Sequence, residues 1–98
     1  MEKSKPHHNL PQIKKLAQSG AVKVTGAAMR DAQNLGFDLL DIIAVIAALS
    51  HGDFYKSMTA YHDHQCWHDV YRPMIDAGQL YIKLLLQNDV LVVSFKER

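Results

Sequence analysis

The sequence predicts an α+β domain, with N-terminal helices packed on a C-terminal antiparallel β-sheet. Helix caps and helical spacing are concentrated in residues 1–50, whereas residues 52–98 contain short apolar and aromatic runs separated by turn residues. A chain of 98 residues is enough for one core, so we expect a single domain over 1–98. Hydrophobic residues make up 48% and charged residues 21% of the chain, which argues against disorder.

The first expected helix begins after Asn9, a good capping residue. Leu10, Ile13 and Leu16 then recur at helical spacing, and Gly20 ends the helix. The segment 22–24 is too short to assign from the sequence, and a small edge strand is one interpretation.

Two further helices are expected before residue 50. Thr25 caps the second, which ends at Gly36. Asp38 caps the third, with Asp41 in its first turn, where the helix dipole favours an anion. This helix contains the longest apolar run, Ile42 to Leu49, which is far too short to cross a bilayer.

Residues 52–98 are expected to form the sheet. Aromatic, β-branched and apolar runs bounded by turn residues predict four strands, over 54–61, 67–72, 79–86 and 90–96. We expect the histidine-rich segment between the first two strands to be a loop.

The last hairpin carries the most information, because a two-residue turn at Asn88 and Asp89 would set its register, whereas a longer turn would change the partners. One face would then hold three apolar pairs, expected in the core: Ile82 with Phe95, Leu84 with Val93, and Leu86 with Leu91. The opposite face would hold Tyr81 with Lys96, Lys83 with Ser94, and Leu85 with Val92. Tyrosine beside lysines on this second face indicates a binding or catalytic surface; the alternative is an ordinary solvated sheet face.

Charge and cysteine content limit the possible functions. Lys and Arg total 11 and Asp and Glu total 10, so a strongly basic nucleic-acid coat is excluded. Nucleic acid would have to bind a local cluster, and Lys56 and Arg72 on the first two strands would extend the lysine and tyrosine surface. A single cysteine, Cys66, excludes an intrachain disulfide. With no apolar leader, we expect a cytoplasmic protein with no membrane contact.

The segment between the first two strands offers two weaker alternatives for a functional site, namely a metal site and a cysteine nucleophile. His62, His64, Cys66 and His68 alternate and would share a face in a strand, as metal ligands can. In the expected loop this alternation carries little weight, so no metal site is expected. Cys66 as a nucleophile would need a neighbouring histidine as base, and we favour an incidental cysteine.

Several segments match one known family in order and content: 1–3, 6–7, 53–59, 63–64, 67–73, 81–83 and 89–97. Over essentially the whole chain, and more loosely in the helical half, the sequence resembles the MqsR family of toxins. The resemblance implies a RelE-like fold and an mRNA interferase: an endoribonuclease independent of ribosome and metal that cuts at GC-containing triplets, typically GCU. It also implies mRNA as substrate and a zinc-containing, DNA-binding MqsA-type antitoxin as partner. No cofactor and no direct DNA binding are expected for this chain.

The resemblance also implies the site residues. The family's proposed catalytic positions fall on Lys56, His68, Tyr81 and Lys96. The expected RNA-binding residues are Tyr55, Met58, Arg72, Lys83 and His7.

The expected chemistry is attack of the RNA 2′-hydroxyl on the adjacent phosphate. Lys56, Lys96 and Arg72 would stabilise the phosphorane, His68 would act as base or acid, and Tyr81 would position the phosphate or share proton transfer. His68 stands where the family pattern has glutamine, so it either adds acid–base capacity or replaces a hydrogen bond to RNA. The alternative function is a non-catalytic RNA- or protein-binding module of the same fold.

Overall fold

The computed structural model describes all residues, 1–98, and its helices begin at the predicted caps. There are three helices, α1 (Leu10–Gln18), α2 (Gly26–Asn34) and α3 (Leu39–Ala47). The side chain of Asn9 accepts a hydrogen bond from the backbone N–H of Gln12 at 2.9 Å. Asp38 and Asp41 each accept the other's backbone N–H, which completes a capping box. No helix combines the length and the apolar character that a membrane span requires.

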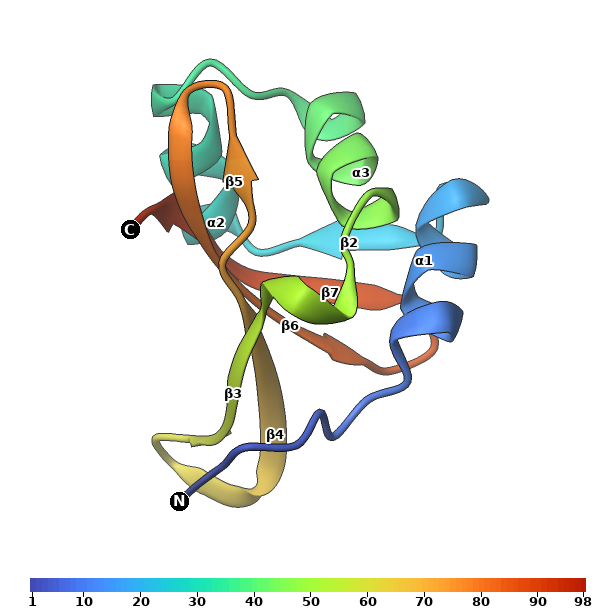
Figure 1. The fold of residues 1–98 in the computed structure, drawn as a ribbon, viewed down its shortest axis with the longest axis vertical. Coiled ribbons are helices and arrows are strands. Elements are labelled where there is room, and N and C mark those ends of the chain that lie inside the picture. Colours follow the sequence, from blue (N-terminus) through green and yellow to red (C-terminus); the bar gives the residue numbers. More distant parts are fainter.

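The strands form one mostly antiparallel sheet in the order β1-β3-β4-β6-β7-β2, with β5 paired to β6 beside this path (Figure 1). Their bounds are β1 (Glu2–Lys3), β2 (Val22–Val24), β3 (Phe54–Ala60), β4 (Asp63–Tyr71), β5 (Met74–Ile75), β6 (Gly78–Leu86) and β7 (Val90–Glu97). A short 3-10 helix, η1 (His51–Asp53), precedes β3. The segment 22–24, which the sequence left unassigned, is an edge strand that pairs with β7 in parallel.

All three helices pack against one face of the sheet, which confirms the predicted α+β architecture. The core joins Ile13, Ala32 and Ile42 of the helices to strand residues that include Ile82 and Phe95. Because side chains alternate along a strand, the residues between these core positions point to the opposite sheet face.

The register of the last hairpin corrects the prediction near its turn. The turn has three residues, Gln87 to Asp89, so Leu86 pairs with Val90 and Leu84 with Val92. Val90 and Val92 are therefore the fully buried residues, and the predicted pairs of Leu84 with Val93, Leu86 with Leu91 and Leu85 with Val92 are wrong. A bulge at Val93 takes up the extra residue. Beyond it, the predicted pairs of Ile82 with Phe95, Tyr81 with Lys96 and Lys83 with Ser94 are present.

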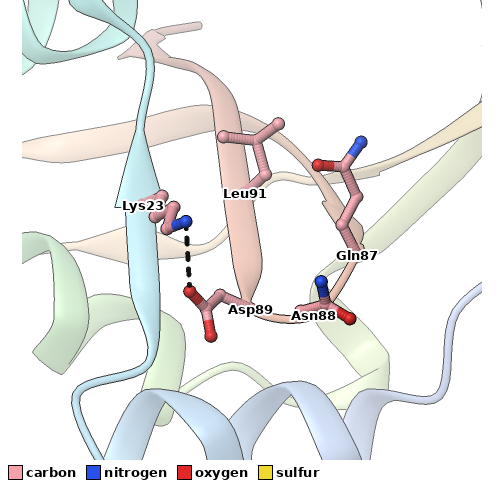
Figure 2. A pocket seen from close by; sticks show the side chains of 5 residues that line it. All are labelled: Lys23, Gln87, Asn88, Asp89 and Leu91. Atoms are coloured by element: carbon pink, nitrogen blue, oxygen red, sulfur yellow. Dashed lines mark ion pairs between the residues drawn. The ribbon is translucent and has the colours of Figure 1, made fainter.

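An ion pair connects this turn to the neighbouring edge strand. Figure 2 shows the carboxylate of Asp89 directed at Lys23 of β2, with 3.7 Å between Oδ2 and Nζ. The backbone N–H of Val90 also donates to the carbonyl of Ala21 at 3.0 Å. Asp89 and Val90 thus have contacts outside the hairpin, which turn rules based on the hairpin sequence do not include.

The expected loop before Trp67 is also wrong, because β4 already begins at Asp63. Asp63 pairs with Ala60 and Trp67 with Thr59, so hydrogen bonding to β3 makes this segment a strand although its first residues are exposed. The resulting β3–β4 hairpin extends beyond the helices (Figure 1). No three His, Cys, Asp or Glu side chains converge on a common point.

The N-terminal segment runs beside β3 and was not predicted as a strand, because two residues carry no periodicity. β1 pairs Glu2 with Met58, and a buried carboxylate holds the chain that follows. Asp69 accepts the backbone N–H groups of His7 and His8 at 2.9 and 2.8 Å, and also the hydroxyl of Ser57. Asp69 is completely buried, so these three donors supply its hydrogen bonds away from water.

Candidate active site

The face of the sheet opposite the helices gathers most of the predicted site residues. Lys56 of β3 pairs with Val70 of β4, Val70 with Lys83 of β6, and Lys83 with Ser94 of β7. In neighbouring rows, Met58 pairs with His68, and Tyr81 with Lys96. We call the surface formed by Lys56, Met58, His68, Tyr81, Lys83 and Lys96 the cationic face.

Aromatic rings stand among the cations of this surface. The guanidinium carbon of Arg72 lies 3.6 Å from the centre of the Tyr55 ring, and Tyr55 is 44% exposed. The ammonium nitrogens of Lys83 and Lys96 lie 5.8 and 5.6 Å from the centre of the Tyr81 ring. Cations bind phosphates and exposed rings stack on bases, so this arrangement suits single-stranded RNA.

Lys56 has a partner that sequence reasoning missed. Oε2 of Glu2, on β1, lies 2.5 Å from Lys56 Nζ. This hydrogen bond raises the pKa of Lys56 and lowers the pKa of Glu2, so both groups are charged at neutral pH. A shallow, open depression of about 360 Å³ lies beside the pair, lined also by Lys3, Ser4 and Tyr55. The only sequence signal for this contact was the match of the chain's opening residues to the family.

His68 is half-buried, and desolvation is the main cause that lowers its pKa. The charge of Lys83 lowers the pKa of His68 further, while Asp69 opposes the shift. The Sγ atom of Cys66 lies 3.7 Å from Nε2 of His68. His68 is therefore neutral at neutral pH, which is the form that can accept a proton.

His7 does not join this site. Its ring stacks on Trp67, with 5.5 Å between ring centres, and its Nδ1 accepts a hydrogen bond from Lys3 Nζ at 2.8 Å. Trp67 neighbours His68 along β4 and therefore points to the helix side of the sheet. The structure thus places His7 on the face opposite Lys56 and His68.

This fold and this surface define a class: a small α+β domain whose open sheet face combines cations, tyrosine rings and one neutral histidine. The family model described as "Motility quorum-sensing regulator, toxin of MqsA" matches residues 5–97. The curated protein "mRNA interferase toxin MqsR" of Escherichia coli (strain K12) is 51% identical over 98 residues, which cover 100% of both chains. The chain belongs to the MqsR toxin family, and the resemblance seen in its sequence is confirmed.

Proposed function

We propose that this chain is an mRNA interferase toxin, an endoribonuclease whose active site is the cationic face. The observation that carries the proposal is the meeting of Lys56, His68, Tyr81 and Lys96 on one open sheet face. Support also comes from the full-length relative, which is named an mRNA interferase toxin.

His68 acts as the general base. Its unprotonated ring nitrogen takes the proton of the RNA 2′-hydroxyl, which then attacks the adjacent phosphate. Burial and the neighbouring charge of Lys83 keep this imidazole neutral, so the base is available at neutral pH. A glutamine at this position would have no such capacity.

The cations stabilise the extra negative charge of the phosphorane. Lys56 and Lys96 approach it from opposite sides of the sheet face, and Arg72 adds a planar guanidinium beside Tyr55. The Tyr81 hydroxyl positions the phosphate next to Lys96. Because side chains supply both the base and the positive charges, the proposed reaction needs no metal ion.

The proposal extends to substrate, partner and location. The substrate is mRNA cut without the ribosome at GC-containing triplets, with GCU as the model sequence, and the family resemblance supports this choice. The partner is an MqsA-type antitoxin, which the family description "toxin of MqsA" supports. The protein acts in the cytoplasm, where messenger RNA and such an antitoxin are found.

A cleavage assay tests the proposal. Purified protein is incubated with a synthetic RNA that contains several GC triplets, in the presence of EDTA, and the product ends are determined. We expect discrete cuts that leave a 2′,3′-cyclic phosphate and a 5′-hydroxyl. Lys56→Ala should reduce cleavage far more than RNA binding, whereas Lys15→Gln, an exposed lysine of α1, should change neither. RNA binding without cleavage would contradict the proposal and favour a non-catalytic module.

A further inference from the structure

Lys83 occupies the middle of the cationic face. Along the row that crosses four strands it lies between Val70 on β4 and Ser94 on β7. Lys56 stands at the β3 end of this row, and Lys96 follows Ser94 at the next outward-facing position of β7. A phosphate bound between Lys56 and Lys96 would therefore lie over Lys83.

The surroundings of Lys83 differ from those of the other two lysines. It is half-buried, and no carboxylate lies within salt-bridge distance of it, whereas Lys56 contacts Glu2 and Lys96 is exposed. The groups that face Lys83 are Lys56 from β3, His68 from β4, Lys96 from β7, and Tyr81 on its own strand. Desolvation first, and then the charges of Lys96 and Lys56, lower the pKa of Lys83.

These contrasts separate the lysines by chemical role. A lysine that contacts a carboxylate holds its protons more tightly and serves as a fixed positive charge. A desolvated lysine among like charges releases a proton more readily, which is the property a general acid needs. Lys83 pairs with Val70, two residues from His68 on the adjacent strand, and its charge acts on His68, so a base and an acid lie beside the same part of the cationic face.

We propose that Lys83 is the general acid that protonates the departing 5′-oxygen of the RNA; this inference rests on the proposed endoribonuclease function. In the reaction, His68 takes the proton of the 2′-hydroxyl while a bond forms between the 2′-oxygen and phosphorus. The bond between phosphorus and the 5′-oxygen breaks, and a proton from the Lys83 ammonium moves to that oxygen. The products are a 2′,3′-cyclic phosphate and a 5′-hydroxyl. Solvent then returns the proton from His68 to Lys83.

The test uses a substrate in which sulfur replaces the 5′-bridging oxygen at the cleaved bond. A thiolate leaves without protonation, so this substrate does not need a general acid. Lys83→Arg keeps the positive charge, but arginine is too weak an acid to give up a proton. We expect Lys83→Arg and Lys83→Gln to lower the cleavage rate of ordinary RNA by about 100-fold or more. On the sulfur substrate, Lys83→Arg should cleave within a few-fold of the wild-type rate.

Two controls define what each result means. Lys56→Ala should be impaired on both substrates because it lacks a phosphorane-stabilising charge, and Lys15→Gln should be impaired on neither. Circular dichroism and thermal unfolding establish that the Lys83 variants are folded. Equal impairment of Lys83→Arg on both substrates, or no impairment on ordinary RNA, would overturn the assignment of Lys83. Failure of the wild-type protein to cleave either substrate would instead contradict the proposed function.

Discussion

Glu2 of the N-terminal strand contacts Lys56 across the edge of the sheet, with 2.5 Å between Oε2 and Nζ. β1 positions Glu2 for this contact. Glu2 pairs with Met58, which lies two residues after Lys56 on β3 and therefore on the same face of the sheet. In the proposed reaction Lys56 binds a phosphate, so the carboxylate of Glu2 and the RNA compete for the same ammonium group.

Glu2→Gln should therefore tighten RNA binding. The amide cannot neutralise Lys56, so we expect the Kd to fall by about two- to five-fold at low salt, and by less at high salt. Fluorescence anisotropy with an RNA that carries 2′-deoxy groups at the cleavage sites measures binding without cleavage. Glu97→Gln changes the net charge equally but alters an exposed residue at the end of β7. Equal gains in both variants would show that net charge alone is responsible.

Asp69 connects the N-terminal segment to the sheet. Replacing its carboxylate with an amide should destabilise the fold and make the N-terminal segment more mobile. Asp69→Asn keeps the shape of the side chain but weakens the hydrogen bonds that it accepts from His7, His8 and Ser57. We expect a loss of about 2–3 kcal/mol in the free energy of unfolding, measured in urea. Hydrogen exchange should rise at the amides of residues 7 and 8.

Asp76→Asn is the matched control, because Asp76 is exposed in the turn after β5. This variant should unfold within about 0.5 kcal/mol of wild type. An Asp69→Asn protein as stable as the Asp76→Asn protein would show that the buried carboxylate does not hold the segment.

The pKa of His68 should be lower than the usual value of about 6.5, and Lys83→Gln should raise it. Removing the Lys83 ammonium takes away one cause of the shift, although desolvation, the larger cause, remains. NMR titration of the His68 ring measures both values, and the acidic limb of the cleavage rate should follow them. Lys15→Gln should leave the titration unchanged. A pKa above the usual value would contradict a neutral base.

The same shift has a consequence for stability. Because the pKa of His68 is lower in the folded chain, the unfolded chain binds more protons below about pH 6.5. The free energy of unfolding should therefore fall as the pH decreases from about 6.5 toward the lowered pKa of His68 in the folded chain.

The sequence could predict which sheet face carries the site, because that face depends on alternation within strands. The predicted pairing of Tyr81 with Lys96 is correct although the predicted turn was one residue too short. The bulge at Val93 restores the predicted register beyond it. Near the turn the same error exchanged the buried and outward residues of β7, where Val90 and Val92 are buried in place of Leu91 and Val93. Contacts between distant segments, such as Glu2 with Lys56, leave no periodic signal, and neither does the buried role of Asp69.

The hydroxyl of Tyr71 gives a last prediction, because it has no hydrogen-bond partner although the residue is completely buried. Burial, with Asp69 and Asp53 nearby, raises the pKa of this phenol, so it stays neutral and contributes no charge. An unsatisfied buried hydroxyl costs free energy. The free energy of unfolding of Tyr71→Phe should therefore equal that of the wild type or exceed it by up to about 1 kcal/mol. Tyr71→Ala removes the ring that packs on Phe54 and should lose about 3–5 kcal/mol. Urea unfolding with an unchanged m value measures both, and a loss above about 1 kcal/mol in Tyr71→Phe would mean that the hydroxyl is hydrogen-bonded in solution.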